Sequence, residues 1–498
     1  MRGTAQKRWA SLFSVIAAGC SLGLLARASG QTLTVYGGPT FDSASGNGFQ
    51  DANETPLGSV AASGAGVGYI DKYVGGTDVG PRAVRWNTSG IALELGNLGT
   101  TNAGSASNIV AATNQNGTVA GTADKYVAGS YLGPRAVRWD TSSPAAIELG
   151  NLGLSNAGTT DTRARGINLG GTVVGFAEKF VGGVDVGSRA VRWDASGVPT
   201  ELGHLGLYPV LGITESVAQV INTSGTAAGI AAVWSPSHDL GNRAVRWDAS
   251  GTVATQLGDL GTDAAGRAYA GTSDINDAGT IVGGAAKYIG GVDKGSRPVR
   301  WDASGTGVTE LGILGTNNDG AGDGFAAAVN SAGTAVGFAA KYVGGVSMGE
   351  RAVRWDASGT AATELGILGT TGIGYSDSYG NDINDAGLVV GYAFKYGGGG
   401  FVGPHAVMWG PDGIAIDLNT LIAPASGWML TGAESITNDN WISGYGLFDP
   451  DGAGPLQPYA RLFLVHVPEP TFMAPLILAA LAVTSRRRAN RYECSNAG

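Results

Sequence analysis

The sequence predicts an all-β protein, a β-propeller built from about eight 54-residue repeats of four strands each. Three observations lead to this prediction: a pentapeptide that returns at a constant spacing, short apolar runs punctuated by glycine, and an incomplete last copy. A period this long and regular indicates one supersecondary unit that is copied, with each copy burying its apolar face against its neighbours.

The pentapeptide Arg-Ala-Val-Arg-Trp, with a few variants, marks each copy. Its tryptophans are spaced by 53 and then five times by 54 residues, and one more step of 54 reaches Phe463, so the unit is written eight times. An aromatic residue at one fixed strand position in each copy favours a place in the core over a sugar-stacking platform. These structural tryptophans are Trp86, Trp139, Trp193, Trp247, Trp301, Trp355 and Trp409.

Each copy contains four short β segments. In the copy that spans residues 167 to 221 we expect them at 172–180, 189–193, 201–206 and 217–221, with a loop at 182–188 and Gly, Asn and Asp turns between them. The array contains no stretch with the apolar spacing of a helix. A meander of this length is typical of a propeller blade, whereas a β-solenoid, the alternative, has shorter coils.

The two ends of the array predict a closed ring. The eighth copy stops before it reaches the Glu-Leu-Gly segment of the other copies, while residues 32 to 36 form an isolated strand-like run. We expect this run to supply the missing edge of the last blade. Closure of this kind removes the exposed sheet edges that promote aggregation.

Both ends of the chain are typical of processing segments. We therefore divide it into a secretory signal peptide at 1–30, the repeat propeller at 31–466 and a sorting segment at 467–498. The two cysteines, Cys20 and Cys494, lie in the end segments, so the propeller has neither a disulfide nor a Cys-ligated metal.

The charge of the propeller excludes some partners. The end segments hold eight of the 31 Lys and Arg residues and two of the 40 Asp and Glu residues, which leaves 23 cations and 38 anions, a net charge of −15. Nucleic acid and anionic lipid surfaces both require clustered positive charge. We therefore expect no nucleic-acid partner and only transient contact with the inner membrane.

Several elements of the repeat resemble the HAF-type extracellular repeats. These are Glu-Leu-Gly-x-Leu-Gly, Ile-Asn-Asp-Ala-Gly at Ile275 and Ile383, and His405-Ala406-Val407, within a similarity that covers residues 60 to 466. Six copies depart from the family by carrying Arg where His is usual. The resemblance implies an exported repeat protein and no established chemistry.

The C-terminal segment resembles a PEP-CTERM sorting signal, which an exosortase processes in Gram-negative envelopes. The residues that carry the resemblance are Pro468, Glu469, Pro470 and, after an apolar run, Arg486, Arg487 and Arg488. The run of about 14 apolar residues is shorter than the ~20 of a comfortable membrane span, and its basic end favours the inside. The signals imply signal peptidase and exosortase as partners, and a final location at the cell surface or outside the cell.

We predict no catalytic, cofactor-binding or metal-ligating residues, and hence no enzyme. The Gly-x-Ser-x-Gly pattern at 345–349 lies in a loop and lacks the following helix of a hydrolase elbow, and the four histidines have no metal-ligand spacing. The paired Arg residues have two interpretations: cross-strand ion pairs with the recurring Glu, or a surface for acidic polysaccharide. Because Gln256 replaces the acid in the fourth copy, we do not expect strict pairing, which fits modest exposed ion pairs.

A possible ligand rim is formed by the acidic loops of four copies, which contain Asp78, Asp185, Asp239 and Asp293. The leading hypothesis is an exported cell-surface or matrix protein with a structural or binding role, its partner a polysaccharide or a surface protein. The alternative is a propeller-type carbohydrate-active enzyme. Copy-to-copy differences separate the two, because a catalytic site breaks the repeat symmetry and an avidity binder keeps it.

Overall fold

The computed structural model describes residues 32–38, 40–42, 45, 47–49, 58–61, 64–89, 91–209, 212–236, 238–398, 400–452 and 454–468. The predicted signal peptide lies outside this part of the chain, as do Glu469, Pro470 and the three arginines Arg486, Arg487 and Arg488, whereas Pro468 is exposed at its end. In these ranges no helix is long and apolar enough to cross a bilayer.

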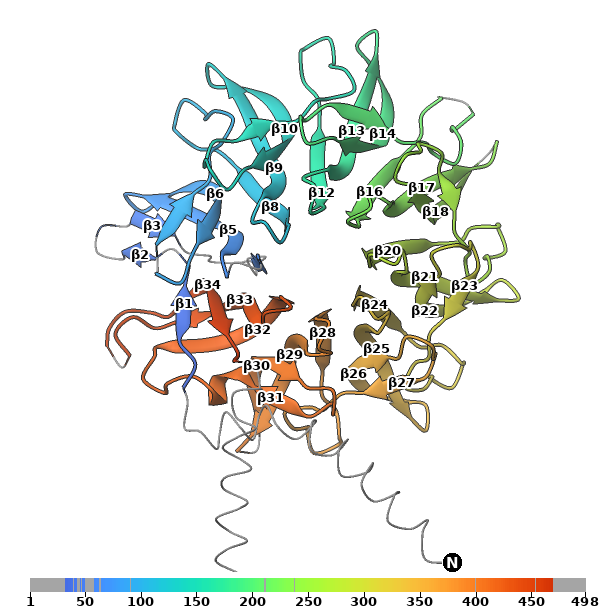
Figure 1. Cartoon of the computed structure of the whole chain (residues 1–498). Coiled ribbons are helices and arrows are strands. Elements are labelled where there is room, and N and C mark those ends of the chain that lie inside the picture. The colour runs from blue at the N-terminus through green and yellow to red at the C-terminus, as the bar shows by residue number, and fades with distance from the viewer. Residues whose placement is uncertain are drawn as a thin grey trace, which may run out of the picture.

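Eight β-sheets stand side by side around a central axis, which confirms the predicted propeller and rules out a solenoid (Figure 1). Seven sheets have four strands, and the first has six because β2 (Phe41–Asp42) and β3 (Asn47–Phe49) extend it. We number the blades 1 to 8 in chain order, so that Trp86 belongs to blade 1 and Phe463 to blade 8.

The strands of each blade follow one another from the axis outward. The innermost are β4 (Gly58–Val60), β8 (Asn108–Thr113), β12 (Thr162–Ile167), β16 (Ser216–Ile221), β20 (Ala270–Ile275), β24 (Gly324–Val329), β28 (Ser378–Ile383) and β32 (Trp428–Ile436). The second are β5 (Gly66–Val74), β9 (Val119–Val127), β13 (Val173–Val181), β17 (Ala227–Trp234), β21 (Ile281–Ile289), β25 (Ala335–Val343), β29 (Val389–Gly397) and β33 (Trp441–Phe448).

The third strands carry the pentapeptide. They are β6 (Thr77–Trp86), β10 (Ser130–Trp139), β14 (Val184–Trp193), β18 (Asp239–Trp247), β22 (Val292–Trp301), β26 (Val346–Trp355), β30 (Gly400–Trp409) and β34 (Tyr459–His466). The outermost are β7 (Ala92–Glu94), β11 (Ile147–Glu148), β15 (Pro199–Glu201), β19 (Thr255–Gln256), β23 (Val308–Glu310), β27 (Ala362–Glu364), β31 (Ala415–Asp417) and β1 (Val35–Gly37); the short 3-10 turn η1 (Leu418–Thr420) follows β31.

The predicted loop at 182–188 is wrong, because β13 and β14 form a hairpin whose turn is only Gly182-Gly183. Both glycines have positive φ, 61° and 81°, as the two central residues of a type I′ turn require. This turn lets β14 begin at Val184, so most of the expected loop is strand. The segment expected at 201–206 is also mostly not strand, since β15 ends at Glu201.

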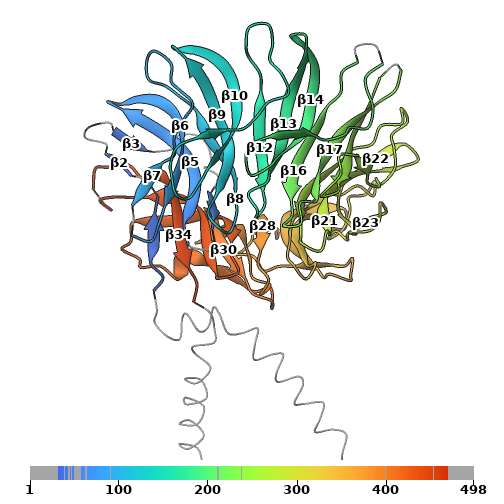
Figure 2. The same cartoon turned by 45° about the horizontal axis from the view of Figure 1, so that its top comes forward.

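The N-terminal strand closes the ring as predicted. β1 pairs antiparallel with β34, with Val35 opposite Val465 and Gly37 opposite Phe463. The described chain therefore begins and ends on the same blade and on the same face of the ring (Figure 2). We call this the turn face, because the turns between first and second strands lie on it, and the opposite one the hairpin face.

Each tryptophan side chain is buried between two blades, which confirms the predicted core role. The seven side chains are at most 1% exposed, and Trp193 packs against Ala120, Ala136 and Leu149 of the preceding blade. The indole Nε1 of Trp193 also donates to the carbonyl of Gly150 at 2.6 Å. Trp86 lies at the seam with blade 8, and its Nε1 has no acceptor within the described residues.

A ring of asparagines joins the blades on the turn face. In blade 3 the Oδ1 of Asn168 accepts the N–H of Thr172 at 3.0 Å, while its Nδ2 donates to the carbonyl of Asn222 in blade 4 at 3.2 Å. The same pair of bonds recurs from Asn114 to Asn384, and the last link runs from Asn384 to the carbonyl of Thr437 in blade 8. Each of these side chains thus stabilises its own turn and its neighbour's.

Substitution of Asn276 by Ala tests this ring. It removes the bond to Thr280 N–H and leaves the carbonyl of Asn330 without its donor, so we expect the free energy of unfolding to fall by about 2–3 kcal/mol. Chemical denaturation measures the change. Asn116→Ala is the matched control: this exposed side chain makes one 3.3 Å bond to Leu169, and its loss should cost about 0.5 kcal/mol or less. Equal effects would contradict the proposed role of the ring.

Candidate functional site on the inner wall

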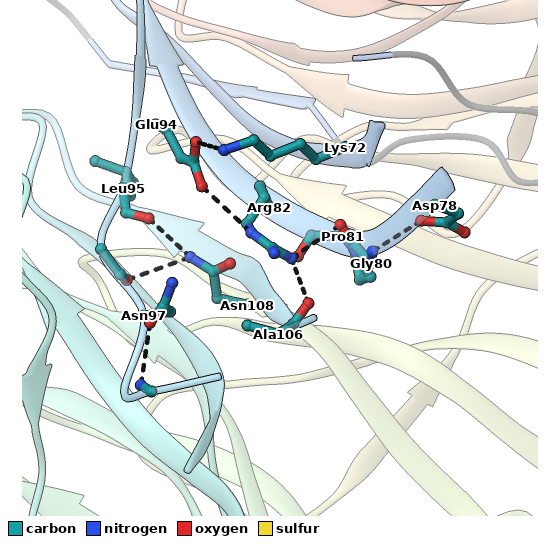
Figure 3. A network of polar contacts seen from close by, with 12 residues as sticks. Lys72, Asp78, Gly80, Pro81, Arg82, Glu94, Leu95, Asn97, Ala106 and Asn108 are labelled. Carbon is teal, nitrogen blue, oxygen red and sulfur yellow. Dashed lines mark hydrogen bonds and ion pairs between the residues drawn. The ribbon is translucent and has the colours of Figure 1, made fainter. Parts of the chain in front are cut away.

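The charged residues common to the copies form a structural network (Figure 3). In blade 1 the carboxylate of Glu94 binds the Nζ of Lys72 at 2.7 Å and the Nε of Arg82 at 3.2 Å. The guanidinium of Arg82 also donates to the carbonyl of Ala106, on the way to blade 2, and its side chain is only 3% exposed. The same arrangement recurs at Arg135, Arg189, Arg297 and Arg351.

The second arginine of each pentapeptide also joins blades. Arg192 of blade 3 donates to the carbonyls of Asp248 and Ala249 in blade 4, both at 2.9 Å. The hypothesis that Arg rows bind acidic polysaccharide is therefore wrong, because the first Arg is buried and the second is committed to the next blade.

Two divergent copies keep the ion pair by other means. In blade 4, where Gln256 stands in place of the acid, Arg243 pairs with Asp259 at 3.4 Å. In blade 7 both His405 and Lys395 contact Asp417, at 2.9 and 2.8 Å. Burial alone would raise the pKa of Asp417, but these bonds hold that pKa below its usual value. We expected the pairing not to be strict and the ion pairs to be exposed. Both expectations are wrong, because both copies keep the pair and the side chains of Arg243 and His405 are buried.

The four rim aspartates lie on the hairpin face but are not brought together. Asp78, Asp185, Asp239 and Asp293 are exposed, one on each of four blades, and stand at the first or second position of a third strand instead of in a loop. Each Oδ1 accepts the N–H of the glycine two residues later at 2.7 Å. These hydrogen bonds therefore stabilise the local backbone conformation.

The inner strands carry a feature that the sequence did not reveal, a β-bulge in each of blades 2 to 8. The register against the second strand shifts by one residue, for example between Ala164 and Gly166 and between Ala433 and Ser435. A bulge turns the side chain of its extra residue away from the regular alternation. The extra residues at this common position are Ala111, Arg165, Gln219, Ser273, Ala327, Asn381 and Glu434, and we call this set the inner wall. Blade 8 has a second shift, at Thr431, which lies outside the set.

The inner wall breaks the repeat symmetry. Where the Trp, the first Arg and the turn Asn are nearly constant, this position holds a cation, two amides, a hydroxyl, two methyls and a carboxylate. Ala111 and Arg165 are exposed, so solvent reaches this part of the ring. On the turn face the interior opens into a cavity of about 650 Å³, lined by the turns of all the blades from 2 to 8 and by Val60.

Aromatic side chains of the first and second strands pack together in blades 6 and 7. The ring of Tyr379 lies 5.3 Å from that of Phe338 and stacks on Tyr392 at 4.8 Å, with an interplanar angle of 24°. The Tyr379 hydroxyl donates to Glu350, and burial together with this bond raises the pKa of Tyr379. These three rings form a continuous aromatic row across blades 6 and 7.

Glu434 is an extra residue of the bulged inner strand of blade 8. Its Oε1 accepts one hydrogen bond, from Asn381 Nδ2 at 3.3 Å, and within the described chain it forms no ion pair. Burial raises the pKa of Glu434 to about 7. Burial and the Glu434 charge also raise the pKa of Tyr392 to about 12 and that of Tyr445 above its usual value.

Two more acids of the inner strands have raised pKa values. Burial raises the pKa of Asp274 to about 6, and burial aided by the charge of Asp274 raises that of Asp382 to about 7. Each accepts an N–H of the next blade, Asp274 from Val329 at 2.9 Å and Asp382 from Ile436 at 2.8 Å.

Positive charge is concentrated on blade 3, across the ring. Arg163 binds the carboxylate of Asp161 at 2.8 Å, and Arg165 lies 5.9 Å from the ring of Phe176. The inner strands therefore differ in charge, with carboxyl groups on blades 5, 7 and 8 and guanidinium groups on blade 3, one of which is paired with Asp161.

The structure supports none of the simple catalytic patterns. In the residues that it describes, no three His, Cys, Asp or Glu side chains are grouped as a metal site. Ser347 of the Gly-x-Ser-x-Gly pattern lies on β26, next to a hairpin turn, and no helix follows it. The sequence analysis missed the inner wall because a bulge does not change the 54-residue spacing of the repeat. The available signal was the variation between copies at Arg165 and Glu434, which lie inside otherwise regular strands.

The comparisons with known proteins add the fold alone. No family model matches the chain, and no curated protein matches it. Among solved structures it is similar to the β-propeller domain of the trilobed protease from Pyrococcus furiosus, with 11% identity, 74% of this chain and 96% of that one covered, and a TM-score of 0.40. It is also similar to prolyl oligopeptidase B from Galerina marginata (10% identity, 91% and 58% covered, TM-score 0.42) and to polysaccharide lyase Uly1 (10%, 88% and 98%, TM-score 0.38).

The raised pKa of Glu434 predicts how stability depends on pH. A carboxyl with a higher pKa in the folded than in the unfolded state binds more protons when folded, so it lowers stability as the pH rises from about 4.5 to about 7. Glu434→Gln removes this cost and keeps an oxygen for Asn381. We expect it to raise the free energy of unfolding by about 2 kcal/mol at pH 8 and to change it little at pH 4.

Denaturation of the variant at the two pH values measures this difference. Glu215→Gln is the control, because it removes an exposed carboxylate from the loop before β16. A Glu434→Gln effect that is the same at pH 4 and pH 8 would show that the carboxyl titrates normally in the folded protein.

Proposed function

We propose that the protein is an exported, non-catalytic ring of the cell surface or extracellular matrix that binds a polysaccharide at its inner wall. One observation carries this proposal. The polar side chains that are constant across the copies form the bonds that join blades, whereas the side chains of the inner wall differ from blade to blade. Affinity for a ligand must then come mainly from the positions that differ.

The side chains of the inner wall, together with the aromatic row of blades 6 and 7, suit sugars. The aromatic row of Phe338, Tyr379 and Tyr392 offers flat apolar faces, while Asn381 and Glu434 offer an amide and a carboxylate that bond hydroxyl groups. A concave, largely preformed site with few converging polar groups is the usual setting for a small ligand unit.

Export follows from the two ends of the sequence. The signal peptide and the PEP-CTERM-like segment imply signal peptidase and exosortase as processing partners. The described chain starts and stops on the turn face (Figure 2), so a ring still held by either end would keep the turn face toward the inner membrane and the hairpin face away from it.

A carbohydrate-active enzyme is the second candidate, and the raised pKa of Glu434 favours it. A carboxyl with a pKa of about 7 is suited to general acid catalysis. New reducing or unsaturated sugar ends, formed from a polysaccharide by the purified protein and lost in Glu434→Gln, would establish this activity and overturn the binding proposal.

A glycan array with the purified protein tests the proposed function. We expect binding of an extracellular polysaccharide, weakened about tenfold or more by Tyr379→Ala and unchanged by Asp185→Asn on the rim. Circular dichroism checks that both variants fold. Binding that is lost in Asp185→Asn and kept in Tyr379→Ala would move the site to the rim, and an array without any bound glycan would contradict the proposal.

A further inference from the structure

The aromatic row of blades 6 and 7 continues outward beyond Tyr392. The ring of Tyr392 lies 6.4 Å from that of Phe394, which lies 5.1 Å from that of Phe401. The ring of Phe401 in turn lies 5.6 Å from that of Tyr396. All these distances fall within the ~4.5–7 Å of interacting aromatic pairs. We call the whole connected set the aromatic track: Phe338, Tyr379, Tyr392, Phe394, Phe401 and Tyr396.

The aromatic track leads from the inner strand of blade 7 to the hairpin face (Figure 1). Tyr379 lies on the innermost strand, β28, and the next two rings of the track lie on β29. Phe401 lies at the start of β30, where it is opposite Tyr396 across the hairpin. Phe401 is 57% exposed, and the other five rings are half-buried. A ligand can therefore reach the track from the hairpin face.

The two phenylalanines of blade 7 depart from the repeat. Phe394 is the sixth residue of a second strand, where blades 1 to 3 carry an acid and blades 4 to 6 carry alanine. Phe401 stands four residues before the pentapeptide, which is the position of the four rim aspartates in blades 1, 3, 4 and 5. The fold therefore does not require an aromatic ring at either position. Exposed apolar side chains that lie together are typical of an interaction site.

The shape of the track favours an extended chain of rings. Protein interfaces are broad patches of about 800 Å² on each partner, whereas the track is one side chain wide. A linear polysaccharide presents one sugar ring after another, and the C–H groups of each ring form an apolar face that can stack on an aromatic side chain. In β-1,4-linked chains the successive rings lie flat and in line, so several of them can follow a row of side chains at once.

The charges along the track favour an uncharged chain. At its inner end the carboxylate of Glu350 accepts the hydroxyl of Tyr379, and it would repel an acidic sugar, as would the acidic propeller as a whole. Lys395 is the only charged residue of β29, and its Nζ is bound to Asp417 at 2.8 Å. Single-stranded nucleic acid also stacks on aromatic side chains, but it needs a positively charged groove.

We infer that the aromatic track binds consecutive units of an uncharged, β-1,4-linked polysaccharide that runs from the hairpin tip of blade 7 toward the inner wall. This inference rests on the proposed function. It names the class of polysaccharide and extends the site from the inner wall to the hairpin face.

Isothermal titration calorimetry of the purified full chain tests the inference with uncharged β-1,4-linked hexamers. The probes are cellohexaose and the hexamer of N-acetylglucosamine, with the two dimers and the β-1,4-linked hexamer of glucuronic acid for comparison. We expect at least one uncharged hexamer to bind about tenfold or more tightly than its own dimer, because only the hexamer is long enough to cover several rings. We expect it to exceed the glucuronic acid hexamer by the same factor.

Two variants use residues that other blades carry at the same positions, so they should fold. Phe401→Ser copies Ser347 of blade 6, and Phe394→Ala copies blades 4 to 6. Each should weaken binding of the hexamer about tenfold. Tyr131→Ser is the matched control: this 51% exposed side chain of blade 2 stands at the position of Phe401, but its row contains only Tyr126. It should leave binding unchanged.

The other outcomes overturn defined parts of the inference. A hexamer that binds no more tightly than its dimer would limit the site to a single sugar unit. Unchanged binding by Phe401→Ser and Phe394→Ala, or an equal loss in Tyr131→Ser, would exclude the track. Equal or tighter binding of the glucuronic acid hexamer would exclude an uncharged ligand. If the glycan array shows a bound polysaccharide while these results fail, the inference falls and the proposed function stands; if no glycan binds, both fall.

Discussion

The buried polar groups of each blade are satisfied by a neighbouring blade, and the ring is held together by this requirement. The Nδ2 of Asn168 needs the carbonyl of Asn222, the Nε1 of Trp193 needs that of Gly150, and the guanidinium of Arg189 needs that of Thr214. An unpaired buried polar group costs about 1–3 kcal/mol, so a single copy gains little by folding alone. The blades are therefore expected to fold cooperatively. The repeated bonds are incomplete at the seam between blades 1 and 8, where the Nε1 of Trp86 has no acceptor within the described residues.

The same requirement determines where function can lie. Side chains that join blades are buried and already bonded, so they are poor sites for a ligand although they are the most constant part of the repeat. The bulge residue of an inner strand has no common bonding partner: those of blades 4, 5, 7 and 8 bond a neighbouring blade, each through a different group, and those of blades 2, 3 and 6 form no such bond within the described chain. It is free to vary, and Arg165 and Glu434 show how far the variation goes. In this protein the side chains that are constant across the copies hold the blades together. A position that differs between copies inside a regular strand indicates the candidate site.

The sequence was sufficient for the fold because its strongest signals are periodic. The spacing of the tryptophans predicted the blades, and the run at 32–36 predicted the closing strand. The sequence was insufficient where a local feature, such as a two-residue turn or a displaced acid, departs from the 54-residue repeat. A Gly-Gly turn needs only two residues, so β14 starts earlier than expected, and the acid that pairs with Arg243 is Asp259, three residues beyond Gln256. The site was missed for a similar reason, because a bulge shifts the alternation of side chains by one, and the contact of Glu434 with Asn381 of the neighbouring blade leaves no trace in the spacing.

The closed ring rests on the pairing of β1 with β34, and an engineered disulfide probes that pairing. Tyr36 and Leu464 are opposite each other, at the ~4.5–5.5 Å between Cα atoms of paired antiparallel residues, which a disulfide can bridge. The only natural cysteines, Cys20 and Cys494, lie in the end segments, so the new pair is chemically distinct. We expect an intramolecular crosslink when Tyr36→Cys is combined with Leu464→Cys, and none when Ala460→Cys replaces the second change. An absent or purely intermolecular crosslink in the first combination would contradict the closed ring.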